Sequence, residues 1–354
     1  MNSIQNRIQA FSELGNFLSQ FSTKGIQKKD GIVNNDLFFD GFQHQMKLAQ
    51  ENNTWFTQEN ILFALENWSK ALTQENLETW ISSEQLQFNE QQKKVAIIMA
   101  GNIPLVGFHD FLSVLISGHR VLVKQSSNDR HLLPFLAKYL EYADASFKGN
   151  ISFTEEKLVG YDAVIATGSN NTARYFEYYF KDKPNIIRKN RNSIAVIQGN
   201  ESAEDFEKLG EDIFRYFGLG CRSVSKIFVP KGFDFDLFFK GMYQQKEIIH
   251  NAKYANNYDY NKAVYLMSEF DILENGFLMI KEDSSYASPI ASMFYEYYDN
   301  PVDLKIKLHQ DAEHIQCIVA DNFVENEVKF GQTQHPELWD YADDVNTLAF
   351  LSTI

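Results

Sequence analysis

Two positions carry side chains suited to nucleophilic chemistry on a carbonyl group. Cys221 follows the glycine-flanked stretch Gly218-Leu219-Gly220, where the backbone allows close approach of a substrate. Arg222 beside it favours the thiolate if its side chain turns toward the sulfur, and does nothing for it otherwise. Asn102 follows the apolar run 95–101, where its amide can donate a hydrogen bond to a developing oxyanion or simply serve a turn.

Two further positions are suited to holding a dinucleotide. Lys124 ends an otherwise apolar run, either as a cation for a ribose or phosphate or as a lysine that reaches solvent. Gly168-Ser169 stands between an apolar run and an amphipathic stretch, so free amides at a helix start could receive a pyrophosphate. Each signal is weak alone, and a structural role is the alternative in each case.

The elements that must position these residues alternate between short apolar runs and amphipathic stretches. The first 92 residues predict helices, with Thr57 at a start and Ile61, Leu65 and Trp68 at helical spacing. The later runs predict strands over 95–102, 120–126, 151–153, 162–169, 193–199 and 225–230, the last two joined by a helix that starts at Ser202 and continues to Phe217. This order favours a parallel sheet, whose ligands bind beyond the carboxyl ends of the strands.

Composition excludes several classes of protein. The 354 residues include 33 Lys and Arg against 47 Asp and Glu, so a net charge of −14 argues against a nucleic-acid partner. Two distant cysteines, Cys221 and Cys317, support neither a disulfide framework nor a zinc module, and Cys317 in an apolar run predicts a core residue. His309 and His314 with Cys317 match no common metal spacing, so we expect no metal. No run is long enough for a membrane span or a signal peptide, which predicts a cytoplasmic protein.

Taken in order, these segments resemble a known superfamily. AGNIPLVGFHDFLSVLISGHRVLVKQSS, ATGS and FGLGCRSVSKIFVP are similar to the aldehyde dehydrogenase segments around the oxyanion asparagine and cofactor lysine, the Gly-Ser turn and the catalytic thiol. The short chain, RKNRNS and FGQTQHPELWDYADDVNTLAFL most resemble the acyl-CoA reductases of the luminescence type. The resemblance implies an α/β, aldehyde-dehydrogenase-like fold with two Rossmann-like parallel-sheet lobes. It also implies that Cys221 is the nucleophile, that Asn102 is the oxyanion donor and that Lys124, Gly168 and Ser169 bind the cofactor.

Departures from the superfamily sharpen the expected reaction. Ile186 aligns with the glutamate that activates water in hydrolytic members, so an acyl-enzyme would persist for hydride or a thiol. The ribose-binding glutamate and its Phe-Gly-Pro turn correspond to Ser285 and 287–289. Ser126 and Ser127 replace an acidic-containing segment near the adenosine ribose, which favours NADPH and leaves NADH open.

The expected organisation is a helical segment over 1–92, a dinucleotide-binding domain over 93–219, a catalytic domain over 220–323 and a return segment over 324–354. The ending TLAFLSTI resembles the superfamily's inter-subunit strand, and since an unpaired apolar edge is a liability in a monomer, we expect a homo-oligomer. The expected reaction is reduction of a fatty acyl-CoA or other acyl thioester to an aldehyde. The alternatives are CoA-dependent aldehyde oxidation, reduction of an acyl phosphate, and a non-catalytic binding protein. His250 and His335 are candidates for the proton donor to the leaving thiolate.

Overall fold

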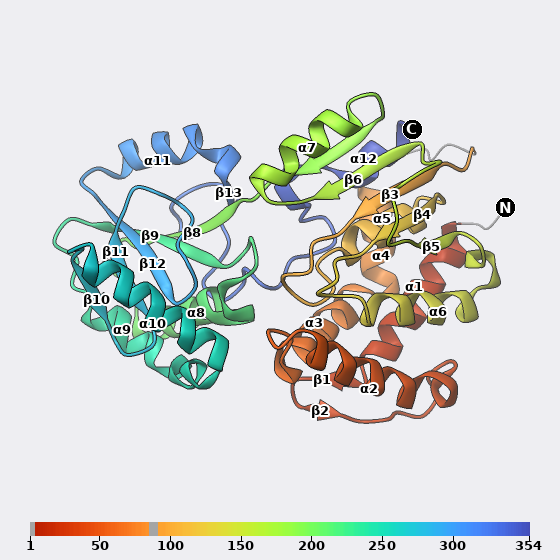
Figure 1. Cartoon of the computed structure of the whole chain (residues 1–354), viewed down its shortest axis with the longest axis horizontal. Coiled ribbons are helices and arrows are strands. Elements are labelled where there is room, and N and C mark those ends of the chain that lie inside the picture. Colours follow the sequence, from red (N-terminus) through yellow and green to blue (C-terminus); the bar gives the residue numbers. More distant parts are fainter. Residues whose placement is uncertain (1–3, 85–90) are drawn as a thin grey trace. The chain divides into compact units, whose positions relative to one another are not determined.

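The computed structural model describes residues 4–84 and 91–354, so residues 1–3 and 85–90 of the expected N-terminal segment lie outside the described residues. Two compact units divide the chain (Figure 1). Unit 1 is Met1–Lys189 with Glu337–Ile354, and unit 2 is Asn190–Pro336. The boundary differs from the expected one at 219/220 because the strand that begins at Asn192 pairs within the second sheet.

Unit 1 is built on a five-stranded, fully parallel sheet of order β5-β4-β3-β6-β7. Its strands are β3 (Lys94–Ile98), β4 (Arg120–Lys124), β5 (Ile151–Phe153), β6 (Ala163–Thr167) and β7 (Asn185–Arg188). The chain adds β4 and β5 on one side of β3 and then β6 and β7 on the other side. The sheet therefore reverses its strand order between β3 and β6, and open α/β sheets bind ligands at such a topological switch point. The strand β7 was missing from the sequence-based assignment.

Helices cover both faces of this sheet. They are α1 (Ile4–Leu18), α2 (Asn35–Asn52), α3 (Gln58–Ala71), α4 (Gln74–Ser83), α5 (Phe108–Ile116), α6 (Leu132–Ala143), α7 (Asn170–Phe180) and α12 (Thr347–Ser352), with a hairpin of β1 (Phe21–Ser22) and β2 (Gly25–Ile26) and short 3-10 turns at Ala145–Phe147 and Ala342–Asp344. The predicted start at Thr57 is confirmed, because its side chain accepts a hydrogen bond from the Asn60 amide. Side chains of α1 to α6 share one core with alternate residues of β3, β4 and β6, so the N-terminal helices belong to unit 1.

The helix α7 packs on the opposite face of the sheet. Phe180 is buried and Phe176 is half-buried against this face. Tyr175 and Tyr179 of the same helix are 65% and 69% exposed.

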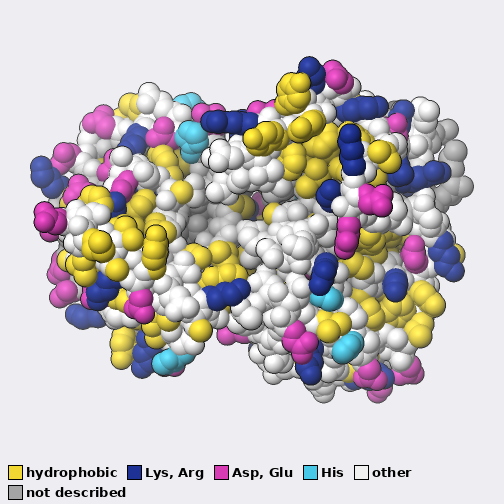
Figure 2. All heavy atoms as spheres, in the orientation of Figure 1, with side chains coloured by type: hydrophobic (Ala, Val, Ile, Leu, Met, Phe, Trp, Pro, Cys, Tyr) yellow, Lys and Arg dark blue, Asp and Glu magenta, His cyan; other side chains and the backbone are white. Residues whose placement is uncertain are grey.

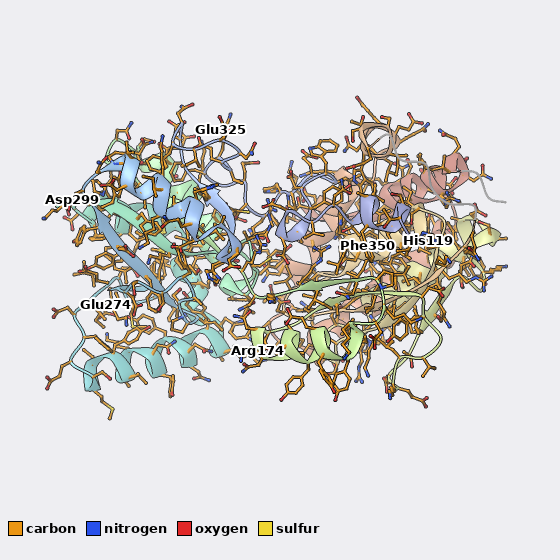
Figure 3. All side chains as sticks on the ribbon, turned by 90° about the horizontal axis from the view of Figure 1, so that it is seen from above. His119, Arg174, Glu274, Asp299, Glu325 and Phe350 are labelled. Atoms are coloured by element: carbon orange, nitrogen blue, oxygen red, sulfur yellow. The ribbon has the colours of Figure 1, made fainter. Side chains whose placement is uncertain are left out.

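The end of the chain is a helix and not the expected strand. Asn346 caps α12 by accepting a hydrogen bond from the Ala349 amide, and Leu348 and Leu351 are buried at i, i+3 spacing. The Leu351 carbonyl also contacts the His119 ring nitrogen at 3.0 Å, in the part of unit 1 where Figure 3 labels His119 and Phe350. The prediction of an inter-subunit strand over TLAFLSTI is therefore wrong, and the argument for an oligomer loses its basis.

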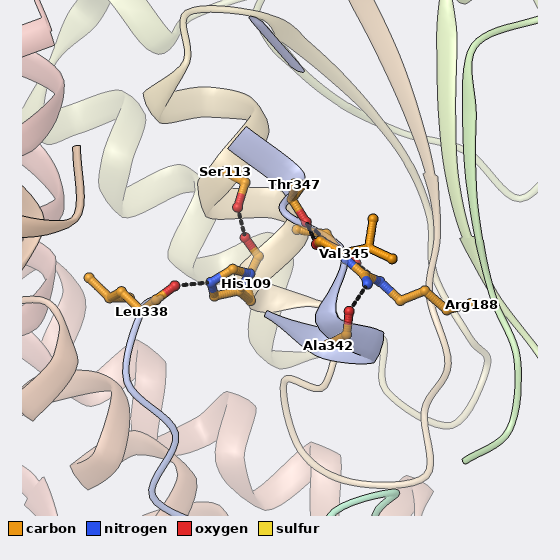
Figure 4. Close-up of polar contacts among 8 residues, drawn as sticks. His109, Ser113, Arg188, Leu338, Ala342, Val345 and Thr347 are labelled. Carbon is orange, nitrogen blue, oxygen red and sulfur yellow. Dashed lines mark hydrogen bonds and ion pairs between the residues drawn. The ribbon is translucent and has the colours of Figure 1, made fainter. Parts of the chain in front are cut away.

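A buried ion pair ties this C-terminal segment to unit 1. Arg188, at the end of β7, pairs with Asp110 of α5 at 2.7 Å. Its guanidinium also donates to the Ala342 carbonyl at 2.6 Å and to the Thr347 hydroxyl at 2.9 Å (Figure 4). Because one buried cation has acceptors on three segments, the return of the chain over residues 337–354 is a fixed part of unit 1.

Unit 2 contains a six-stranded sheet of order β10-β11-β12-β9-β8-β13, parallel except for the β10–β11 pair. Its strands are β8 (Asn192–Val196), β9 (Val224–Pro230), β10 (Ile272–Glu274), β11 (Met279–Glu282), β12 (Ser292–Tyr298) and β13 (Ile315–Val319). Its helices are α8 (Ala203–Phe214), α9 (Asp236–Met242), α10 (Ala252–Met267) and α11 (Pro301–Gln310), with 3-10 turns at Arg215–Gly218, Tyr243–His250 and Ala312–His314. The predicted cap at Ser202 is confirmed as a capping box with Asp205, but α8 ends at Phe214 rather than Phe217.

Within the described residues, no helix is long and apolar enough to cross a bilayer. On the face that Figure 2 shows, lysine and arginine side chains are interspersed with carboxylates. The net charge of −14 therefore leaves local basic positions that can meet an anionic ligand.

Candidate active site

The loop after β3 carries Asn102, in an irregular backbone that packs tightly against the loop after β4. The strand ends at Ile98, so Asn102 lies four residues beyond it and not directly after it as expected. A Cβ on Gly101 would lie 2.6 Å from the Ser126 side chain. The loop therefore fits at this point only with a glycine, and the half-buried Asn102 is held next to it.

A buried carboxylate fixes the middle of this loop. Leu105 adopts the left-handed region at φ 57°, which is unfavourable for a leucine. Its amide donates to Asp129 Oδ2 at 2.8 Å, and Asp129 is 8% exposed. Burial raises the pKa of Asp129 to about 6, although the hydrogen bond from Leu105 acts in the opposite direction. The Asp129 carboxylate thus stabilises the backbone that carries Asn102.

The expected cofactor residues of β4 lie where that strand ends. Lys124 is its last residue, and its ammonium donates to the Glu156 carbonyl at 3.0 Å. Ser126 accepts a hydrogen bond from the Asn128 amide through its hydroxyl, and Ser127 is exposed. The strand stops two residues earlier than predicted, so both serines belong to the loop.

Gly168 and Ser169 form the junction between β6 and α7, as the sequence predicts. The Ser169 hydroxyl caps the helix by accepting a hydrogen bond from the Thr172 amide at 3.3 Å. A Cβ on Gly168 would lie 3.0 Å from the Phe176 ring, so a glycine is needed for the helix to pack this closely. The junction presents the amino end of α7 beside an uncharged cap.

Sheet register brings these unit 1 positions to one edge. Ile98 of β3 pairs with Lys124 on one side and with Ala166 on the other. The residues that follow each strand, including Asn102 and Gly168, therefore lie at the carboxyl edge of the same parallel sheet. This edge includes the switch point, the Lys124 cation and the start of α7, and all three features suit a dinucleotide.

Cys221 lies in unit 2, in a hydrogen-bonded turn that leads into β9. The Ser223 amide donates to the Gly220 carbonyl at 3.0 Å, which places Cys221 and Arg222 at the two central positions of the turn. The Cys221 carbonyl accepts a hydrogen bond from the Ser193 hydroxyl at 3.0 Å. Cys221 is half-buried, whereas Cys317 is buried as predicted.

Arg222 is directed toward a distant segment of unit 2. Its Nε donates to the Thr333 carbonyl at 2.6 Å. Next to it, Ser223 Oγ accepts a hydrogen bond from Gln334 at 3.3 Å. Of the two roles left open for Arg222, its hydrogen bond to Thr333 supports a structural one.

The remaining candidates from the sequence occupy ordinary surroundings. Ile186, at the position of the missing base, is a buried residue of β7. Ser285 follows β11, and its amide donates to the Asp283 carboxylate. His250 is exposed and lies 3.2 Å from Glu247, whereas His335 is half-buried just after Gln334. Among the described residues, no group of three or more His, Cys, Asp and Glu could hold a metal ion.

Sequence reasoning missed two buried aspartates. Asp212 of α8 is completely buried, and its position three residues after Leu209 puts it on the apolar face of a helix that it shares with Ile213. A carboxylate at an apolar helix position is a signal that the sequence does contain. Asp129 offered no such signal, because it lies in a loop of polar residues.

Comparisons with known proteins give the family and the fold. The family model of acyl-CoA reductase (LuxC) matches residues 29–238, which is more than half of the chain. A long-chain acyl-protein thioester reductase of Aliivibrio fischeri is 22% identical over 261 residues, covering 67% of this chain and 53% of the relative, so the chain spans about half of that protein.

Solved structures of aldehyde dehydrogenases resemble the whole fold. An indole-3-acetaldehyde dehydrogenase of P. syringae, in complex with NAD+, has a TM-score of 0.61 at 12% identity, over 90% of this chain and 72% of its own. An NAD-dependent benzaldehyde dehydrogenase from Corynebacterium glutamicum has a TM-score of 0.63 at 10% identity, over 90% and 76%. The predicted α/β fold with two Rossmann-like sheets is confirmed, and the chain belongs to the acyl-CoA reductase (LuxC) family.

Proposed function

We propose that the chain reduces a fatty acyl thioester to the aldehyde, with a nicotinamide dinucleotide as hydride donor and Cys221 as nucleophile. The observation that carries the proposal is the place of Cys221, a half-buried thiol at the centre of a hydrogen-bonded turn before β9, in a chain of the acyl-CoA reductase family. A cysteine in such a turn has its backbone restrained while the residue is only half-buried, which suits a nucleophile that a substrate must reach.

The proposed steps balance with one hydride from the dinucleotide and one proton from solvent. The Cys221 thiolate attacks the acyl carbonyl, a new C–S bond forms, the old C–S bond breaks, and the released thiol takes a proton. Hydride then reduces the Cys-linked thioester, and collapse releases the aldehyde and restores the thiolate. In this scheme the Asn102 amide is assigned to the oxyanion of both tetrahedral intermediates, together with a backbone N–H near Cys221.

The residues of the carboxyl edge of unit 1 suit the cofactor. A reduced nicotinamide dinucleotide supplies the hydride when bound. Lys124 offers a cation at the end of β4, and the amino end of α7 after Gly168 and Ser169 offers free amides to a pyrophosphate.

Preference for NADPH rests on the loop after β4. Residues 125–128 are uncharged, and the first carboxylate, Asp129, is buried and accepts the Leu105 amide. A 2′-phosphate near the exposed Ser127 would therefore meet no repelling carboxylate from this loop. We propose NADPH as the preferred donor and NADH as the weaker one.

The absence of a carboxylate at position 186 supports reduction over hydrolysis. Ile186 pairs with Ile165 inside the sheet and is 6% exposed. Because an apolar strand residue cannot activate water, the acyl-enzyme would persist until hydride arrives.

Substitution of the nucleophile tests the proposal. Purified protein with NADPH and a series of saturated fatty acyl-CoA esters is expected to consume NADPH and release CoA in equal amounts. Cys221→Ala should abolish both, whereas Cys317→Ala, which removes the buried cysteine, should retain turnover. Unchanged turnover in Cys221→Ala would sink the mechanism.

The same assay separates the acyl donors and the alternative reactions. A fatty acyl group carried on a protein thiol, the donor suggested by the name of the curated relative, replaces the CoA ester in a parallel arm. Phosphate release would instead indicate an acyl phosphate, and formation of acyl-CoA from aldehyde, CoA and NADP+ would measure the oxidative direction. Absence of turnover with every donor would favour a binding protein.

A further inference from the structure

We infer that Asp212 is a positioning residue for the nucleophile, acting through the segment Gly331–Gln334 that holds the turn of Cys221. The inference rests on the proposed function, because it takes Cys221 to be the reacting thiol. It gives a role to the FGQTQ stretch near the end of the chain, which the proposed chemistry does not itself use.

Asp212 binds the segment Gly331–Gln334 with both carboxylate oxygens. Oδ2 accepts the Gly331 amide at 2.6 Å, and Oδ1 accepts the Thr333 amide at 2.9 Å and the Thr333 hydroxyl at 2.8 Å. Asp212 and Thr333 are completely buried. Three donors directed at one buried carboxylate fix the position of this segment against α8 more firmly than packing alone.

The held segment then contacts the nucleophile turn at two adjacent residues. The Thr333 carbonyl accepts a hydrogen bond from Arg222 Nε at 2.6 Å, and Gln334 donates to Ser223 Oγ at 3.3 Å. Arg222 and Ser223 directly follow Cys221 in the turn that the Ser223 amide closes.

A separate contact holds the other side of the turn. Ser193, the second residue of β8, donates its hydroxyl to the Cys221 carbonyl at 3.0 Å. The backbone of Cys221 is thus held between β8 and the segment Gly331–Gln334, and Asp212 is the group that anchors the second of these supports. Loss of that anchor would weaken one of these two supports.

The position of the carboxylate in the helix agrees with this role. Asp212 lies on the buried face of α8, where a leucine would pack without a desolvation cost. The Gly331 backbone lies at φ 79°, and a Cβ there would be 3.1 Å from the Lys208 side chain. The segment is therefore shaped to approach α8 closely, and an apolar residue at position 212 would leave its amides without acceptors.

Four variants test the inference with the full-length protein. Asp212→Asn replaces one acceptor oxygen by a donor, and Thr333→Val removes the hydroxyl at similar volume. Thr333→Ser keeps the hydroxyl, and Glu207→Gln removes an exposed charge from the same helix as a matched control.

The first readout is the rate of Cys221 alkylation by iodoacetamide over a range of pH, which mass spectrometry follows on the Cys221 peptide. The other readouts are kcat and KM with acyl-CoA and the Kd for NADPH. We expect Asp212→Asn and Thr333→Val to shift the alkylation profile and to lower kcat by about 10- to 100-fold, as expected for a displaced reacting group. The Kd for NADPH should stay within about twofold, because the proposed cofactor residues belong to unit 1. Thr333→Ser and Glu207→Gln should match the wild type.

Wild-type alkylation and kcat in both Asp212→Asn and Thr333→Val would overturn the inference, and so would equal losses in Thr333→Ser and Thr333→Val. If Asp212→Asn does not fold, the Thr333 pair decides alone. Failure of the proposed function looks different, because alkylation of Cys221 needs no turnover: an active Cys221→Ala variant refutes the nucleophile, while the alkylation rates still report whether Asp212 controls that thiol.

Discussion

A buried aspartate supports the Asn102 loop in unit 1, and another supports the segment next to the Cys221 turn in unit 2, but the two accept different numbers of hydrogen bonds. Asp129 contacts the Asn102 loop directly, whereas Asp212 contacts the segment Gly331–Gln334 that meets the Cys221 turn, and burial raises the pKa of both aspartates to about 6. Asp129 receives one amide from the Asn102 loop, and its Oδ1 accepts no hydrogen bond within the described part of the chain. Asp212 receives three donors, all from a segment about 120 residues away.

The Asn102 loop and the Cys221 turn are also restrained by different kinds of contact. The Asn102 loop joins β3 to α5 and packs against the loop after β4, so close packing at Gly101 supplies much of its restraint. The Cys221 turn follows a 3-10 segment in which Tyr216 and Phe217 are left-handed, and it relies on hydrogen bonds from distant residues. Close packing therefore dominates at the Asn102 loop, and polar contacts dominate at the Cys221 turn.

Among variants of the two segments, removal of the Asn102 amide should have the largest effect on kcat. Asn102→Ala is expected to lower kcat by about 10²-fold, because an oxyanion donor would be lost. Steady-state reduction of acyl-CoA measures it. Asn128→Ala, an exposed amide in the neighbouring loop, is the control and should change kcat little. A mild effect of Asn102→Ala would return Asn102 to a turn role.

Crowding at Gly101 should produce the next largest effect. Gly101→Ala places a Cβ 2.6 Å from the Ser126 side chain, so we expect a loss of about 1–3 kcal/mol in the free energy of unfolding and a lower kcat. Chemical denaturation and turnover measure the two quantities. Gly149→Ala, at φ 77° with open space around it, should carry only a backbone cost of about 1–2 kcal/mol and keep kcat. Equal behaviour of the two variants would contradict steric restraint of the Asn102 loop.

The raised pKa of both aspartates predicts a pH dependence of stability. Their folded-state pKa of about 6 lies above the usual 3.8, so the folded protein binds these protons more tightly than the unfolded chain. This contribution is fully present below the unfolded pKa and is lost as the pH rises through about 6, by up to about 3 kcal/mol for each group. For Asp212, the nearby Glu211 raises the pKa further, while the donors of Gly331 and Thr333 lower it.

Chemical denaturation at pH values from about 4 to about 7, in steps of about one pH unit, measures how the free energy of unfolding changes with pH. Asp129→Asn and Asp212→Asn should each flatten it, because neither asparagine titrates. The absolute stability should fall more in Asp212→Asn, since three donors lose their carboxylate. Slopes that are unaltered in both variants would show that other groups dominate the titration.

The two serine caps provide the smallest and most selective test. Ser169→Ala and Ser202→Ala should each cost about 1 kcal/mol of stability, because each hydroxyl caps a helix. If Ser169 also binds the cofactor, Ser169→Ala alone should raise the KM for NADPH. An equal KM in the two variants would leave Ser169 as a cap only.

Many of the helices and strands follow from local sequence patterns. The apolar runs that became β3 to β6, and the caps at Thr57 and Ser202, depend on residues close together in the chain, and the structure confirms them. The ending TLAFLSTI failed because a short apolar stretch fits a strand or a helix equally well, and its burial beside α5 decided for a helix.

The sequence by itself determined the family resemblance, the parallel α/β class and the prominence of Cys221, because glycine-flanked turns and strand periodicity are local properties. Tertiary structure decided which residues support the proposed chemistry. Asp212 contacts Gly331 and Thr333 only in the folded unit 2, and local sequence patterns do not indicate a contact between residues 119 and 121 positions apart. Burial gives these carboxylates their raised pKa and their importance, and burial is a property of the folded chain.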